Sequence, residues 1–94
     1  MYIVVVGAGT VGYGLSLELQ GLADHEVVMV DRDRARAAEL REELGEMVVH
    51  GDGTEVVFLE SVGTRRADIL IAVTGDDGTN LIACQVAKIG RAHV

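Results

Sequence analysis

The 94-residue sequence has no proline, no tryptophan, one cysteine, two tyrosines and one phenylalanine. A single cysteine excludes an intrachain disulfide bond, so nothing in the sequence requires an oxidising compartment. Because aromatic side chains are so few, the core must be built from valine, leucine, isoleucine and alanine. Basic residues are also few, eight against 15 acidic ones, which gives a formal net charge of -7. This charge argues against a nucleic-acid or anionic-membrane partner, but not against anionic nucleotides, since backbone dipoles hold phosphate in acidic proteins.

The sequence also lacks a long hydrophobic run. Its first apolar segment, residues 2–6, is too short for a membrane span or a signal peptide, and no positively charged segment precedes it. We therefore expect a cytoplasmic protein that does not insert into the membrane. A length of 94 residues allows a single domain, residues 1–94, with one core.

Four short apolar runs alternate with helical patterns. The runs are continuous, which is typical of strands covered on both faces, and they lie at Tyr2–Val6, Val27–Val30, Met47–Val49 and Ile69–Val73. Apolar residues recur between them with helical spacing, at Val11, Leu15, Leu19 and Leu22, at Ala37, Leu40 and Leu44, and at Val56, Leu59 and Val62. This alternation predicts an α/β fold, a Rossmann-like doubly wound parallel sheet with strand order 3-2-1-4.

Glycines and capping residues mark the ends of the predicted helices. Each helix is expected to stop at a glycine suited to the left-handed conformation, Gly21, Gly45, Gly63 and Gly90. The expected N-caps are Asp33, Thr54 and one of Asp76, Asp77 or Thr79. The acids of residues 39–46, mixed with Arg36 and Arg41, are interpreted as a solvated helix face.

A glycine-rich segment, Gly7-Ala8-Gly9-Thr10-Val11-Gly12, follows the first predicted strand and opens the first helix. This is the context of the G-x-G-x-x-G loop of dinucleotide-binding domains. The first glycine permits a tight turn, the second lets the backbone approach a pyrophosphate, and the third allows close packing of helix on strand. The amides at the helix N-terminus would bind the phosphates. The alternative is a plain glycine turn.

Asp31 ends the second strand, about 20 residues beyond the glycines, where an acid binds the ribose diol in such folds. A carboxylate there repels a 2′-phosphate, which favours NAD or an adenosine nucleotide over NADP. Arg32 weakens this inference, because an arginine can accept that phosphate or stack on adenine. Asp33 is better explained as a helix cap.

Small or polar segments follow all four predicted strands, and in a parallel sheet they meet at one edge. This edge is the predicted binding site. We expect Asp52 to accept a hydrogen bond from the adenine amino group, and Thr74 and Gly75 to lie across the phosphates from the first loop. Asp77 and Asn80 either contact the second ribose or hold their own loop. The candidate site residues are Gly7, Ala8, Gly9, Thr10, Val11, Gly12, Asp31, Arg32, Asp52, Gly53, Thr54, Thr74, Gly75, Asp77 and Asn80.

Two other polar residues are weaker candidates. His50 ends the third strand near the site, but no cysteine or second histidine offers metal-ligand spacing, so a structural role is favoured and no metal site is predicted. Cys84 lies in a predicted helix beside Ala83 and Val86, which favours a small buried side chain.

Five motifs, at residues 3–12, 30–33, 49–54, 67–77 and 80–84, cover nearly the whole chain. Together they resemble the nucleotide-binding N-terminal lobe of regulator-of-potassium-conductance domains, which occur in Trk- and Ktr-type potassium-uptake regulatory subunits and in ligand-gated potassium channels. The turn at residues 51–54 combined with the loop at residues 74–80 is far more specific than the glycine motif.

The resemblance implies a cytoplasmic, homo-oligomeric, non-enzymatic subunit that binds NAD(H), ATP or ADP and gates a membrane-embedded potassium transporter or channel. It assigns Gly7, Gly9 and Gly12 to phosphate, Asp31 to ribose and Asp52 to adenine. Many members carry an arginine where this chain has Thr10, which favours NAD(H) or a diphosphate here over ATP. The competing function is the cofactor lobe of an NAD-dependent oxidoreductase, although no Tyr-Lys, Cys or His constellation supports it.

The family lobe continues beyond the fourth helix. We therefore expect a partial domain, truncated after its fourth βα unit, in which the fourth strand is a sheet edge. An apolar edge pairs readily with another strand, so self-association through this edge is expected.

Overall fold

A computed structural model describes residues 1–22, 25–63, 66–75 and 80 of the chain. In this part of the chain, four parallel strands form a sheet of order β3-β2-β1-β4. The strands are β1 (Tyr2–Val6), β2 (Glu26–Asp31), β3 (Val48–His50) and β4 (Ile69–Ala72). The helices are α1 (Thr10–Gln20), α2 (Arg34–Leu44), α3 (Val56–Ser61) and the short 3-10 helix η1 (Gly45–Met47). The predicted α/β class and strand order are confirmed.

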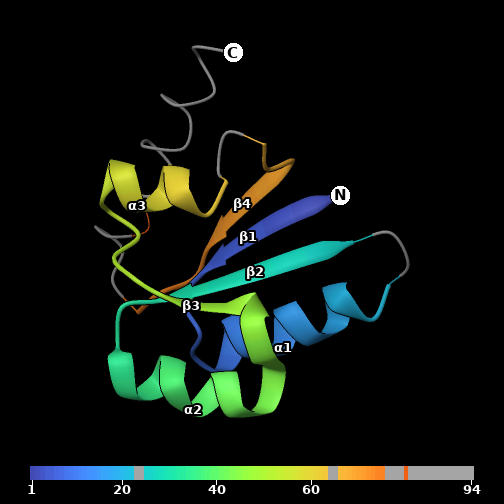
Figure 1. Cartoon of the computed structure of the whole chain (residues 1–94). Helices are drawn as coiled ribbons and strands as arrows, with labels where there is room; N and C mark the ends of the chain where they lie inside the picture. Colours follow the sequence, from blue (N-terminus) through green and yellow to red (C-terminus); the bar gives the residue numbers. More distant parts are fainter. Residues whose placement is uncertain (23–24, 64–65, 76–79, 81–94) are drawn as a thin grey trace.

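Helices cover both faces of the sheet, with α3 on one face and α1 and α2 on the other (Figure 1). Two apolar clusters fill the two layers. The strand residues buried on the α1–α2 side pack with Ala37 and Leu40. Those buried on the α3 side are different residues, and they pack with Leu59 and Ala67. Residues 3–6 of β1 are buried on both faces. This explains why the strand is a continuous apolar run rather than an alternating one.

The packed face of α1 follows the prediction only in part: Leu15 and Leu19 are half-buried, and Leu19 packs against the core. Val11 and Leu22 are 66% and 56% exposed, whereas the residues that α1 buries are Gly12 and Ser16. The reason is the short distance between the start of α1 and the turn before it: a Cβ added at Gly12 would lie 1.8 Å from the carbonyl oxygen of Gly7. Only small residues fit at such a contact, so the Val11 side chain next to Gly12 faces outward, whereas Tyr13 and Leu19 pack against the core as partly buried side chains.

The start of α2 is capped as predicted. Oδ1 of Asp33 accepts hydrogen bonds from the backbone N–H groups of Ala35 (3.0 Å) and Arg36 (3.3 Å). These bonds satisfy two of the amides that a helix leaves without intrahelical partners.

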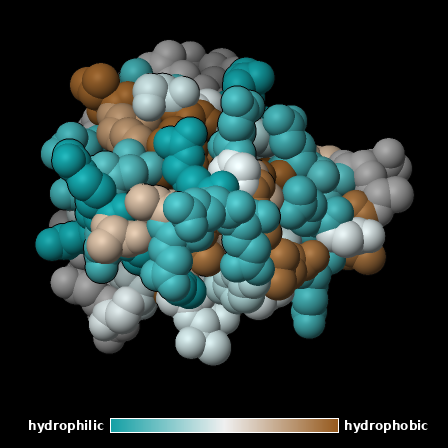
Figure 2. All heavy atoms as spheres, turned by 60° about the horizontal axis from the view of Figure 1, so that its bottom comes forward, coloured by the Kyte–Doolittle hydropathy of each residue, from teal (hydrophilic) through white to brown (hydrophobic). Residues whose placement is uncertain are grey.

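Figure 2 shows a mostly hydrophilic surface on the side of α1 and α2, with separate apolar spots.

The other helix ends follow the prediction in part. Gly45 and Gly63 have positive φ angles of 77° and 86°. Gly21 has a φ of −70°, so its predicted left-handed conformation is wrong. In the right-handed turn found instead, the Gly21 N–H bonds to the Leu17 carbonyl and the Leu22 N–H to the Leu19 carbonyl. Gly90, Cys84 and the caps expected at residues 76, 77 and 79 lie outside the described residues. Within the described residues, no helix combines the length and apolar character needed to cross a membrane.

Candidate functional site

The register of the sheet brings the carboxyl ends of its strands to one edge. Val6 at the end of β1 pairs with Val30 in β2 and with Ala72 in β4. Backbone hydrogen bonds continue beyond the strands, because Gly7 N–H donates to Val30 O (2.7 Å) and Val73 N–H donates to Val6 O (2.8 Å). The polar segments that follow the strands therefore lie side by side, as predicted.

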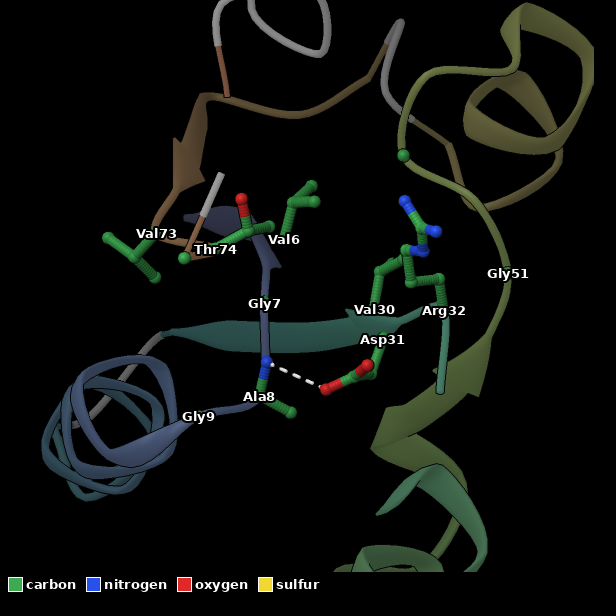
Figure 3. A pocket seen from close by; sticks show the side chains of 12 residues that line it. Val6, Gly7, Ala8, Gly9, Val30, Asp31, Arg32, Gly51, Val73 and Thr74 are labelled. Atoms are coloured by element: carbon green, nitrogen blue, oxygen red, sulfur yellow. Dashed lines mark hydrogen bonds between the residues drawn. The ribbon is translucent and has the colours of Figure 1, made fainter. Parts of the chain in front are cut away.

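A cavity of about 440 Å³ opens between these segments (Figure 3). Eight of the candidate site residues line it, namely Gly7, Ala8, Gly9, Asp31, Arg32, Gly53, Thr74 and Gly75. The other lining residues are Val6, Val30, Gly51 and Val73. These three valines carry no polar signal in the sequence, but each stands at or just beyond the end of a strand, which is where the wall of such a cavity begins.

The other candidates among the described residues do not line this cavity. Thr10, Val11 and Gly12 form the first turn of α1, with Gly12 buried against the Gly7 turn. Asp52 and Thr54 lie in the segment after β3, and Asn80 lies behind Thr74. Asp77 lies outside the described residues.

The turn between β1 and α1 requires glycine at its first position. Gly7 has a φ of +109°, and a Cβ there would lie 2.9 Å from backbone atoms of Val73 and Thr74. A Cβ at Gly9, in contrast, would meet no described atom within 4 Å. The loop is thus closely packed behind Gly7 and has open space at Gly9.

Asp31 connects the end of β2 to this loop. Its Oδ2 accepts a hydrogen bond from the Ala8 N–H at 3.1 Å (Figure 3), and its Oδ1 accepts one from the Asp33 N–H at 2.9 Å. The carboxylate is half-buried and also lines the cavity.

Asn80 holds the segment after β4. Its Oδ1 accepts a hydrogen bond from the Thr74 N–H at 2.9 Å and one from the Thr74 hydroxyl, and its Nδ2 donates to the Thr74 carbonyl at 3.2 Å. Of the two roles expected for Asn80, the structure shows the one in which it holds the loop. Asn80 thereby orients Thr74 on the cavity wall.

A second hollow of about 350 Å³ adjoins the cavity and shares Arg32 and Gly51 with it. Its other lining residues are His50, Asp52, Glu55 and Phe58. His50 Nε2 lies 3.0 Å from the Arg32 carbonyl oxygen, which agrees with a structural role. Within the described residues, no three or more His, Cys, Asp or Glu side chains are grouped to hold a metal ion.

Thr54 does not cap α3, contrary to the prediction. The N-cap is Glu55, and in the described part of the chain no side-chain hydrogen bond caps this helix. The Thr54 hydroxyl and N–H donate instead to Asp52 Oδ1, at 2.7 and 2.8 Å. The sequence places an acceptor two residues before Thr54, and this local turn satisfies the threonine before the helix begins.

These contacts change the acidity of Asp52. The hydrogen bond from the Thr54 hydroxyl and then that from its N–H, assisted by the positive charge of Arg32, hold the pKa of Asp52 below its ordinary value. The ionised carboxylate is therefore the form that the folded chain prefers.

The contribution of Asp52 to stability is expected to depend on pH. A carboxyl whose pKa is lower in the folded than in the unfolded chain stabilises the fold above the unfolded value of about 3.9, and this contribution is lost as pH falls through the folded pKa. Melting curves of the wild type and Asp52→Asn from pH 7 to pH 3 should show a small advantage of the wild type at pH 7 that disappears in acid. An advantage that grows in acid would contradict this assignment.

The sequence pattern places Arg36 on a solvated helix face, and this interpretation is wrong. The side chain is half-buried, and its Nε donates a hydrogen bond to the Ala8 carbonyl at 3.1 Å. Because Asp33 caps α2 beside the glycine loop, the first turn of the helix faces that loop. The acids Glu39, Glu42 and Glu43 farther along α2 are exposed, as predicted.

The sheet order, the glycine turn after β1 and the acid at the end of β2 define a Rossmann-like α/β domain. Residues 3–93 match the model of the TrkA-N domain family, and the chain belongs to this family. The family was thus correctly recognised from the sequence motifs.

The names of proteins similar to this chain are consistent with the TrkA-N family. A "Trk system potassium uptake protein TrkA homolog" from Pyrococcus abyssi is 38% identical over 90 residues, which cover 94% of this chain and 38% of that protein. A homologue of the same name from Archaeoglobus fulgidus is 36% identical over 95 residues, covering 100% of this chain and 21% of that protein. One from Methanosarcina mazei is 39% identical over 89 residues, covering 95% and 21%. The chain therefore spans between about a fifth and two fifths of these relatives.

Proposed function

We propose that this chain is the nucleotide-sensing domain of a potassium uptake system, and that it binds NAD(H) in the cavity at the carboxyl ends of β1, β2 and β4. Membership of the TrkA-N family supports the link to potassium transport. The observation that carries the ligand assignment is the cavity itself, in which an open glycine loop faces a half-buried carboxylate. Its volume falls in the usual range of ligand sites.

The glycine loop fits a pyrophosphate. Gly9 leaves room for a group to approach the backbone, and the loop leads directly into the N-terminus of α1. The amides of a first helical turn point outward along the helix axis and carry a partial positive charge, which attracts phosphate even in an acidic protein. In our proposal Gly7 shapes this loop, Ala8 is held by Asp31 as part of it, and the amides from Gly9 to Gly12, with Thr10 and Val11 between them, face the phosphates.

The Asp31 carboxylate fits a ribose. Each of its oxygens accepts one backbone N–H, and an ionised carboxylate offers about four acceptor positions, so two remain for the hydroxyls of a diol. Arg32 and Asp52 line the adjoining hollow, which would take the adenine; Arg32 and Gly51 are shared with the cavity, and Gly53 lines the cavity beside them. Thr74 and Gly75 form the opposite wall, across from the phosphates.

The same residues favour NAD(H) over other nucleotides. The Asp31 carboxylate repels the 2′-phosphate of NADP(H). Thr10 provides no positive charge for a terminal phosphate, which favours a dinucleotide or ADP over ATP.

In our proposal the domain acts by regulation rather than catalysis. Among the described residues that line the cavity, none is a Tyr, Lys, Cys or His that would exchange a proton with a substrate of the nicotinamide. A nucleotide with different affinities for two conformations of a homo-oligomer shifts their equilibrium, and this is sufficient to gate a membrane-embedded potassium transporter or channel at its cytoplasmic side.

A thermal-shift series with NADH, NAD, NADP, ATP, ADP and AMP tests the proposal. A ligand at 100 times its Kd stabilises the folded chain by about 2.7 kcal/mol, and we expect NADH to raise the Tm most and NADP least. The absence of a shift with all six ligands would contradict nucleotide binding. Turnover of NADH with a hydride acceptor would instead support the oxidoreductase alternative.

A further inference from the structure

We infer that Arg36 is a positioning residue of the glycine loop: together with Asp31 it fixes two consecutive peptide groups around Ala8, and so preorganises the loop for a phosphate-bearing ligand. The part of this inference that concerns the ligand rests on the proposed function. The part that concerns the loop rests on the contacts of Ala8 alone.

Both backbone polar groups of Ala8 are held by side chains from outside the loop. Its N–H donates to Asp31 Oδ2 at 3.1 Å, and its carbonyl accepts from Arg36 Nε at 3.1 Å. Asp31 is the last residue of β2, whereas Arg36 lies in the first turn of α2. Ala8 itself is fully buried. Hydrogen bonds from two different elements, β2 and α2, thus hold the centre of the loop.

These two bonds determine where the neighbouring amide points. A trans peptide group is planar, and its C=O and N–H are directed oppositely. The bond from Arg36 to the Ala8 carbonyl therefore fixes the direction of the Gly9 N–H, and Gly9 lines the cavity. The Gly9 carbonyl, in the next peptide group, accepts the Tyr13 N–H at 2.8 Å, which joins the end of the loop to the first turn of α1.

A loop of this composition needs such anchors. Glycine residues on both sides of Ala8 have more conformational freedom than any other residue, and that freedom must be lost before a ligand can be bound in one geometry. Binding is tighter when the loss has already occurred in the unliganded protein. Arg36 suits this role because its own backbone is fixed by the Asp33 cap and its guanidinium stays charged.

Arg36 does not belong to the residues that line the cavity. Its effect on a ligand would therefore pass through the loop and not through a direct contact. This distinguishes it from Arg32, which lines the cavity itself.

The test compares Arg36→Met with Arg41→Met, which removes the same charge from an exposed position in the last turn of α2. We expect Arg36→Met to weaken NADH and ADP by about tenfold, as for the loss of a hydrogen bond from a charged group, while the affinity for adenosine stays the same. Arg41→Met should change none of the three. Arg36→Lys, which retains a cationic donor, should recover part of the loss.

Two further measurements separate positioning from direct contact and from general damage. The dependence of NADH affinity on salt should be equal in the wild type and Arg36→Met, and a smaller salt dependence in the variant would overturn positioning in favour of a phosphate contact. Without any ligand, the amides of residues 7–9 should shift in NMR spectra and exchange faster in Arg36→Met only. Unchanged amides, or an equal loss of adenosine affinity, would overturn the inference. If the amides respond but the wild type binds no nucleotide, the grip on the loop is supported and the proposed function fails.

Discussion

Replacing Gly12 with alanine is expected to destabilise the chain by about 3 kcal/mol or more. The added Cβ would lie 1.8 Å from the carbonyl oxygen of Gly7 and 3.0 Å from its carbonyl carbon. These are backbone atoms of a turn that is itself packed against Val73, so no side-chain rotation relieves the clash. The helix α1 would have to move away from the sheet and lose part of its buried contact. Urea denaturation monitored by circular dichroism measures the change.

Gly14→Ala is the matched control for this experiment. It makes the same chemical change in the same helix, at an exposed position where an added Cβ meets no described atom within 4 Å. There the greater helix propensity of alanine should stabilise the chain by up to about 1 kcal/mol. The two variants are therefore expected to have effects of opposite sign. Equal effects would show that α1 does not pack as closely on the Gly7 turn as the structure indicates.

The fold was predictable because its strongest determinants are local in the sequence. A strand buried on both faces is a continuous apolar run, as in residues 3–6. A helix can begin at a recognisable capping residue, as α2 does at Asp33 after β2. Parallel strands need crossovers of one hand, so the strand order follows from few alternatives.

The packing of α1 was predictable only in part from the same rules, which select Leu15 and Leu19 correctly. Helical periodicity assumes that large apolar residues face the sheet, and it selects Val11 and Leu22 for this reason. In the structure the close contact to the sheet is made at Gly12, the neighbouring Val11 is exposed, and Leu22 is exposed beyond the end of the helix. The short distance between Gly12 and the Gly7 turn determines which residue of the first helical turn faces the sheet, and this distance cannot be read from the sequence.

The candidate site shows the same limit. Most of the residues that line the cavity are polar or glycine and could be selected from the sequence, but the valines that line it are of the same residue type as the core. Arg36 lies in a helix rich in charged residues, and its neighbours in the sequence do not reveal which of these charges faces the glycine loop. Thr54 is a good capping residue whose hydroxyl is used by Asp52 instead. Side-chain partners across a turn depend on geometry that only the folded chain supplies.

Asp31→Asn is expected to lower the affinity for NADH by about 100-fold. In the proposed complex the carboxylate accepts both ribose hydroxyls while it holds the Ala8 and Asp33 amides. An asparagine retains one acceptor oxygen but loses the negative charge and the second acceptor, and two hydrogen bonds to a charged group are together worth about 3 kcal/mol. Isothermal titration with NADH measures the loss.

Asp33→Asn provides the control, two residues away and with the same change of charge. Asparagine is as good an N-cap as aspartate, so α2 and the NADH affinity should both be retained.

A comparison with NADPH separates a ribose contact from damage to the loop. Removal of the carboxylate ends its repulsion of the 2′-phosphate and leaves Arg32 beside that group, so the preference for NADH over NADPH should fall in Asp31→Asn. If both cofactors weaken equally, Asp31 acts only by holding the glycine loop, and the ribose assignment is wrong.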